Sequence, residues 1–219
     1  MTKKTSSKQT KAIEYISLLA PVDLANYDKS LGFHSKRFIQ DLIKIQSEKD
    51  DNEFRLILLS ILKKTLLQAK NYLKENLYKN NDGAIYVCTH TVIMDQLISI
   101  IHRTVSERFR IKKIIGLSIL AVGGYGRGEL APHSDIDVLF LHQKNQLSQH
   151  QPIIEYILYL LWDLGLKVGH ATRTIDQSLS AASSDITIMT SLLEIRLIHG
   201  DEQLFDTFDA RLRFWLANQ

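Results

Sequence analysis

Two acidic residues one position apart, Asp135 and Asp137, carry the clearest chemical signal in this sequence. Side chains alternate along a strand, so residues two apart point to the same side, with their Cα atoms roughly 6.6 Å apart. Carboxylates held that close repel each other unless a cation lies between them. Mg²⁺ prefers carboxylate oxygens, commonly together with substrate phosphates. The pair therefore predicts a magnesium site for phosphoryl chemistry, in which two ions bind the attacking and the leaving oxygen.

A glycine pair, Gly123-Gly124, precedes these acids in the sequence. Glycine lets backbone N–H groups approach a phosphate without a Cβ in the way. A glycine-rich turn that leads into a helix also adds the favourable dipole of the helix N-terminus. We therefore predict that Gly123 and Gly124 bind phosphate oxygens. Glycine pairs and Asp-x-Asp sequences are each common alone, and their combination is the more specific signal.

Two polar side chains near these motifs are further candidates for phosphate contacts. Arg127 either contacts a phosphate or forms a surface ion pair with Glu129. Ser134 either donates to a phosphate or caps the following strand. No Gly-Lys-Ser/Thr sequence follows the glycines, which excludes a Walker-type P-loop. The glycine spacing after Gly124 also does not fit a dinucleotide-binding fingerprint.

The glycines and acids lie at the ends of two predicted inner strands. A continuous apolar run over 114–122 leads into the glycines, and the run over 134–141 is apolar on both faces after Asp137. Such runs are typical of strands buried inside a sheet. Residues 125–130 are too glycine-rich for a strand and predict a tight turn into a short helix. A third strand is predicted over 166–174.

Helices are predicted on both sides of this sheet region in the sequence. The predicted helices cover 54–77 and 85–109, separated by a turn at 80–83, and 153–164 after Pro152, 176–182, 185–199 and 204–216. The order predicts an α+β fold with a small mixed sheet. We expect a disordered tail over 1–12, an N-terminal helical region over 13–112 and a sheet domain with C-terminal helices over 113–219.

The composition narrows the function classes only slightly. The 219 residues include 27 basic and 24 acidic ones, and the resulting charge of +3 is too small to indicate a nucleic acid or an anionic membrane as partner. The single Cys88 excludes an intrachain disulfide and a Cys/His metal cluster, which fits the cytoplasm. Neither a signal-peptide pattern nor a run of about 18 apolar residues is present, so no membrane span is expected.

The segment AVGGYGRGELAPHSDIDVLFLH, residues 121–142, resembles the signature of nucleotidyltransferases of the DNA polymerase β superfamily. Within that superfamily, the pieces GGYGRGEL and VGHATRT resemble the bacterial PII uridylyltransferase/uridylyl-removing enzymes. The similarity extends over residues 85–208. It implies a polymerase β-like domain that transfers UMP from UTP to a tyrosine of the PII nitrogen-signalling protein in the cytoplasm.

The same resemblance implies roles for individual residues. Asp135 and Asp137 would bind two Mg²⁺ ions, and the phosphates of UTP would lie against the glycine pair. A third acid on a later strand usually completes this metal site, but the predicted third strand carries none. Asp185 is the nearest candidate, with the alternative that it stabilises a helix N-terminus. Arg173 either faces the nucleotide or is a charge at the strand edge.

Other functions stay open at this level. The chain could use another nucleotide or acceptor, or it could bind nucleotide or PII without catalysis. Family members also carry an HD phosphohydrolase domain and two glutamine-sensing ACT domains. Because these 219 residues hold no His-Asp doublet, uridylyl removal and glutamine sensing are not expected in this chain.

Overall fold

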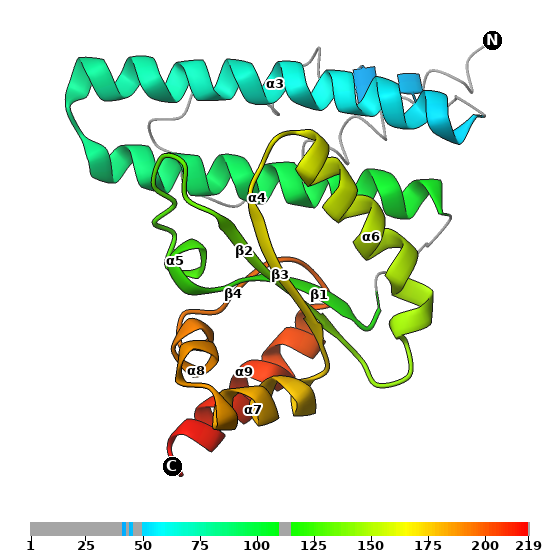
Figure 1. Ribbon diagram of the computed structural model, residues 1–219, viewed down its shortest axis with the longest axis vertical. Helices are drawn as coiled ribbons and strands as arrows, with labels where there is room; N and C mark the ends of the chain where they lie inside the picture. The colour runs from blue at the N-terminus through cyan, green and yellow to red at the C-terminus, as the bar shows by residue number, and fades with distance from the viewer. Residues whose placement is uncertain (1–40, 43, 46–49, 110–114, 219) are drawn as a thin grey trace, which may run out of the picture. The chain divides into compact units, whose positions relative to one another are not determined.

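The computed structural model describes residues 41–42, 44–45, 50–109 and 115–218 (Figure 1). The chain divides into two compact units, with the boundary between Thr104 and Val105. The predicted tail over 1–12 lies outside the described residues. The predicted domain boundary at 112/113 also lies outside them and stays a prediction.

The first unit contains the helix α3 (Asp51–Asn80) and most of the helix α4 (Gly83–Arg108). α3 begins where the side chain of Asp50 accepts a hydrogen bond of 2.8 Å from the third amide of the helix, a typical N-cap. α3 ends at Asn81, which adopts a left-handed conformation with φ 51°. The Asp82 carboxylate then accepts an amide of α4 at 3.0 Å. The two predicted helices and the turn between them are confirmed.

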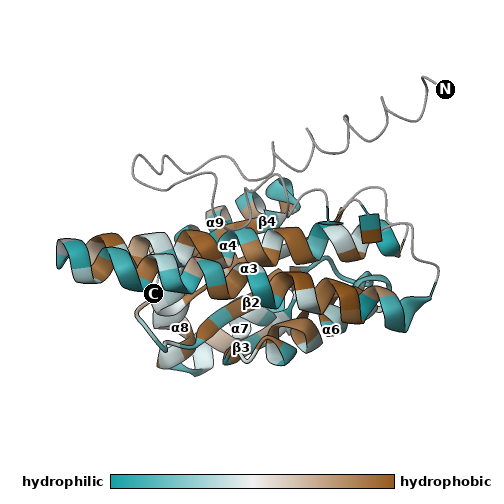
Figure 2. Cartoon of the chain, turned by 90° about the horizontal axis from the view of Figure 1, so that it is seen from above, coloured by the Kyte–Doolittle hydropathy of each residue, from teal (hydrophilic) through white to brown (hydrophobic). Residues whose placement is uncertain are grey.

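One helix among the described residues, α4, is long and apolar enough to cross a membrane by length and composition. However, 61% of its most apolar window of 18 residues is buried inside the protein. Figure 2 shows hydrophilic residues interspersed along both α3 and α4. A buried core helix has the same composition, so α4 is only weak evidence for a span.

The second unit is built on a four-stranded mixed sheet with the order β3-β2-β1-β4. Its strands are β1 (Leu117–Ala121), β2 (Ile136–His142), β3 (Val168–Arg173) and β4 (Arg196–Gly200). β1 runs antiparallel to β2 and β4, whereas β2 runs parallel to β3. The predicted α+β class is therefore confirmed, and the two apolar runs form the inner strands. Every residue of β1 is buried.

The fourth strand corrects the prediction of a helix over 185–199. α8 (Ile186–Leu192) is short, and the chain then extends along β1, with Arg196 opposite Ala121 and Gly200 opposite Ser118. A short apolar segment can become a helix or a strand, and periodicity alone does not separate the two. Pairing with β1, which is distant in sequence, decides the outcome here.

The other helices of this unit are α5 (Gly123–Gly126), α6 (Leu147–Asp163), α7 (Ile175–Ser184) and α9 (Glu202–Leu216). α6 begins earlier than predicted, and Pro152 lies inside it rather than at its start. The ring Nε2 of His150 lies 3.1 Å from the carbonyl oxygen of Ile115, which fixes the first turns of α6 beside the segment before β1. This tertiary contact explains the longer helix.

The helices α7, α8 and α9 gather beside one another next to the sheet (Figure 1). Their apolar side chains form a core with alternate residues of the inner strands: Leu120, Leu139, Leu141, Ile175, Ala182, Leu192, Leu204, Phe208 and Leu212. Asp137 shares the alternation of Leu139 and Leu141, so its side chain points to the same face of the sheet. The sheet thus directs one acid of the predicted pair toward the side of α8.

Candidate functional site

The glycine pair lies directly at the end of β1, where it forms the first turn of α5. Gly123 has φ +58°, a left-handed conformation that favours glycine. The first amides of a helix have no acceptor within the helix, so those of Gly123 and Gly124 are available to a ligand. The predicted order of turn and helix is reversed, because the one-turn helix comes first and the turn over 127–128 follows it.

Asp137 is the second residue of β2, and Asp135 immediately precedes this strand. Burial raises the pKa of the half-buried Asp137, and the charge of Asp135 raises that pKa further. The charge of Asp135 thus disfavours the ionised form of Asp137, while the metal-binding role of the pair stays a prediction. The backbone carbonyl of Asp137 accepts a hydrogen bond of 3.1 Å from the amide of Val122, which ties the acid to the start of the glycine turn.

Gly169 on β3 makes room for the carboxylate of Asp137. The two residues are register partners in the parallel pair of β2 and β3. A Cβ built on Gly169 would overlap Oδ1 of Asp137. No sequence pattern marks Gly169 as a site residue, although it stands inside the VGHATRT segment that carries the family resemblance. Its role depends on strand register, which the sequence pattern does not reveal.

An open cleft of about 300 Å³ joins these features. Among the predicted site residues, it is lined by Gly123, Asp137 and Arg173. α8 contributes Thr187, Ile188, Ser191 and Leu192 to the lining, which no motif had indicated. The cleft therefore brings together the end of β1, the start of β2, the strand β3 and one side of α8.

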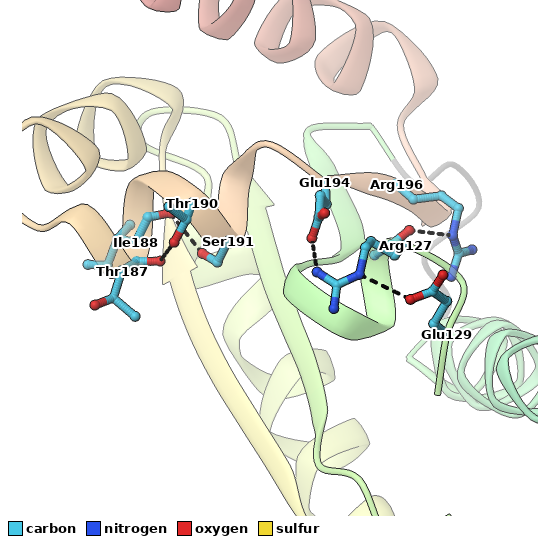
Figure 3. A network of polar contacts seen from close by, with 9 residues as sticks. Arg127, Glu129, Thr187, Ile188, Thr190, Ser191, Glu194 and Arg196 are labelled. Atoms are coloured by element: carbon cyan, nitrogen blue, oxygen red, sulfur yellow. Dashed lines mark hydrogen bonds and ion pairs between the residues drawn. The ribbon is translucent and has the colours of Figure 1, made fainter. Parts of the chain in front are cut away.

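Arg127 follows α5 and forms ion pairs with two glutamates (Figure 3). Its Nε lies 3.3 Å from the Glu129 carboxylate, and its Nη1 bonds to Glu194. This is the surface ion pair that the sequence left open, while a phosphate contact by Arg127 stays a prediction. Arg196 of β4 donates to the carbonyls of Tyr125 at 3.2 Å and of Gly126 at 3.3 Å, so it fixes the end of α5.

Asp185 caps the N-terminus of α8. Its Oδ1 accepts the amides of Thr187 at 2.7 Å and Ile188 at 3.3 Å, and these hydrogen bonds lower the pKa of Asp185. The described part of the chain contains no group of three His, Cys, Asp or Glu side chains that could hold a metal ion. The helix-capping alternative thus describes the local structure of Asp185, and its role as a third catalytic acid stays a prediction.

Of the remaining predicted site residues, Arg173 lines the cleft and Ser134 does not. Ser134 is exposed in the turn before β2, where its amide donates to the carbonyl of Ala131 at 3.2 Å. Arg173 lies near enough to Asp185 for its charge to lower the pKa of that acid slightly. His170 contacts the ring of Trp162 on α6, with ring centroids 5.8 Å apart. Because it alternates with Gly169, it points away from the face that carries Asp137.

Comparison with known proteins identifies the domain. Residues 98–189 match the family model of the nucleotidyltransferase domain, and this range includes the glycine turn, both acids and most of the cleft. The chain contains a nucleotidyltransferase domain. The predicted resemblance to this superfamily is thereby confirmed.

Relatives of this nucleotidyltransferase domain carry the name bifunctional uridylyltransferase/uridylyl-removing enzyme. The relative from Rhodospirillum rubrum is 39% identical over 171 residues, which is 76% of this chain and 18% of the relative. That from Novosphingobium aromaticivorans is 48% identical over 134 residues, 58% of this chain and 14% of the relative. That from Caulobacter vibrioides is 39% identical over 184 residues, 82% of this chain and 20% of the relative. The chain thus spans a fifth or less of the length of these relatives.

Two substitutions of Asp185 separate a catalytic role from a capping role. Asparagine also caps helices well, so Asp185→Asn should keep the stability of the domain. Asp185→Ala removes the cap and should lower the free energy of unfolding. Urea denaturation measures this difference. If Asp185 is a metal ligand, both variants lose nucleotidyl transfer, whereas wild-type transfer by Asp185→Asn would limit the residue to capping.

Proposed function

We propose that this nucleotidyltransferase domain transfers UMP from UTP to a tyrosine of the PII signal protein in the cytoplasm. The observation that carries the proposal is that Gly123 and Asp137, at the ends of two inner strands, line one cleft. A phosphate site beside an acid is the arrangement that nucleotidyl transfer needs. The names of the relatives support uridylyl as the transferred group.

Asp135 and Asp137 are the residues that would hold magnesium. Burial is the main cause of the raised pKa of Asp137, and the charge of Asp135 adds to it, so both burial and repulsion disfavour the ionised pair. A divalent cation offsets such repulsion, so the pair fits a hard cation with carboxylate ligands. When bound, Mg²⁺ neutralises the phosphate charge and favours the deprotonated form of an attacking hydroxyl.

The other groups of the cleft would position the triphosphate. The amides of Gly123 and Gly124 would donate to phosphate oxygens, and Arg173 would add a positive charge. The tyrosine oxygen of PII forms a bond to the α-phosphorus, the bond from that phosphorus to the bridging oxygen breaks, and pyrophosphate leaves. The tyrosine proton passes to solvent. Phosphoryl transfer of this kind depends mainly on positioning and electrostatic stabilisation.

Incubation of the chain with PII, Mg²⁺ and labelled UTP, ATP or CTP tests the proposal. We expect label on PII from UTP alone, and none when Mg²⁺ is removed. Label from ATP or CTP would instead support a different nucleotide, and label on another acceptor would contradict PII as the substrate. Transfer also requires binding, so UTP with Mg²⁺ should raise the melting temperature more than ATP does. A folded chain that shows neither effect would be a non-catalytic module.

A further inference from the structure

The cleft beside Asp137 extends beyond the groups that would hold phosphates. A triphosphate held by Gly123 and Asp137 would leave the rest of the lining to contact the nucleoside. This lining is mostly apolar and comprises Val122, Leu139, Ala171, Ile188 and Leu192. Pockets for small ligands combine such apolar walls with a few placed polar groups. The inference rests on the proposed function, and it concerns the base that the cleft selects.

Thr187 and Ser191 of α8 contribute two hydroxyl groups to the polar part of this lining. The Ser191 hydroxyl donates to the carbonyl oxygen of Ile188 at 2.8 Å (Figure 3). The Thr187 side chain is a minor contributor to the lowered pKa of Asp185, after the backbone amides of Thr187 and Ile188. A hydroxyl has a single hydrogen, so an oxygen that already donates can only accept further hydrogen bonds. The Ser191 hydroxyl in the lining therefore offers an acceptor to a ligand.

We propose that the side of α8 with Thr187, Ile188 and Ser191 is the nucleobase subsite, and that Ser191 Oγ accepts the N3–H of uracil. Ser191 is half-buried, and Ile188 one turn earlier supplies an apolar surface for the flat ring. Uracil carries an N–H at ring position 3, whereas cytosine carries a bare acceptor nitrogen there. Cytosine would place two acceptors against each other unless Ser191 gave up its bond to Ile188. The subsite thus selects an imide-type pyrimidine.

Four ligands separate the base subsite from the phosphate site in the wild-type chain. Binding with Mg²⁺ is measured by calorimetry for UTP, CTP, N3-methyl-UTP and inorganic tripolyphosphate. We expect UTP to bind about tenfold more tightly than CTP or N3-methyl-UTP, because both lack the hydrogen that Ser191 accepts. Tripolyphosphate reports the phosphate site alone. Equal binding of UTP and N3-methyl-UTP would overturn the proposal without any variant.

The variant Ser191→Ala tests the acceptor itself. It should weaken UTP binding about tenfold and leave CTP and tripolyphosphate binding unchanged. Thr190→Ala is the matched control, because the Thr190 hydroxyl also donates within α8, to the carbonyl of Thr187 at 3.0 Å, and does not line the cleft. Thr190→Ala should bind all four ligands as the wild type does. A Ser191→Ala variant that still prefers UTP over CTP would overturn the assignment.

Base selection by Ser191 and UMP transfer to PII can be lost independently of each other. Binding that selects UTP through Ser191, without transfer of label to PII, would contradict the proposed function and support the subsite. Transfer of UMP to PII with an unchanged base preference in Ser191→Ala would contradict the subsite and support the function. Absence of tripolyphosphate binding in the presence of Mg²⁺ would overturn both, because the subsite is defined relative to the phosphate end of the cleft.

Discussion

Asp137→Asn should reduce UMP transfer to PII by about 10³-fold while the fold remains intact. The asparagine amide lacks the negative charge that binds magnesium. Without bound magnesium the charge on the phosphates is not neutralised, which raises the activation free energy by several kcal/mol. Asp135→Asn should have a similar effect. The measurement is the initial rate of label transfer from UTP at saturating Mg²⁺. Wild-type transfer by either variant would contradict the metal assignment.

Asp137→Asn should not lower the thermal stability of the metal-free protein. Burial and Asp135 raise the pKa of Asp137 in the folded state above its unfolded value. A raised pKa means that the folded state favours the protonated acid, so the associated stability is present below the ordinary pKa of aspartate and is lost as the pH rises through the raised value. At neutral pH the ionised Asp137 is therefore destabilising, and asparagine removes that effect.

Thermal denaturation from pH 4 to pH 8, with a metal chelator present, measures how ionised Asp137 affects the melting temperature. Asp137→Asn should melt at or above the wild-type temperature at pH 7, and its advantage should shrink toward pH 4. Asp206→Asn is the control, because Asp206 is exposed on α9 and does not line the cleft. It should leave both the melting temperature and UMP transfer unchanged. An Asp137→Asn variant that melts well below the wild type at pH 7 would show that the carboxylate stabilises the fold.

Gly169→Ala should reduce UMP transfer by about 10²-fold without unfolding the domain. The added Cβ would overlap the carboxylate of Asp137. That carboxylate ends a flexible side chain, so it can move aside, and a displacement of about 1 Å at a reacting centre costs roughly 10²-fold in rate. The variant should also require more Mg²⁺ for half-maximal transfer. Wild-type Mg²⁺ dependence in Gly169→Ala would contradict the role of Gly169.

A double-mutant cycle tests whether Gly169 acts through Asp137. The double variant Asp137→Asn/Gly169→Ala should transfer UMP as slowly as Asp137→Asn alone, because the carboxylate that the Cβ displaces is already absent. Gly83→Ala is the control for replacing a glycine, since a Cβ on Gly83 would meet nothing within 4 Å. It should keep wild-type transfer. Additive losses in the double variant would show that Gly169 acts independently of Asp137.

The sequence by itself determined the features that depend on neighbouring residues. The acid pair and the glycine pair are local patterns, and the apolar runs beside them predicted the two inner strands, β1 and β2. These predictions hold because strand alternation and burial on both faces act within a few residues. The long helices α3 and α4 were predictable because the three- and four-residue spacing of their apolar residues is also a local pattern.

Only the tertiary structure decided the features that depend on distant segments. β4 is a strand because it pairs with β1, although its sequence is also compatible with a helix. Gly169 acquires its role from the register between β2 and β3, and α8 becomes part of the cleft through packing beside the sheet. Asp185 is an N-cap because α8 begins at the next residue, Ile186. Contacts of this kind join residues far apart in the chain, and local periodicity carries no information about them.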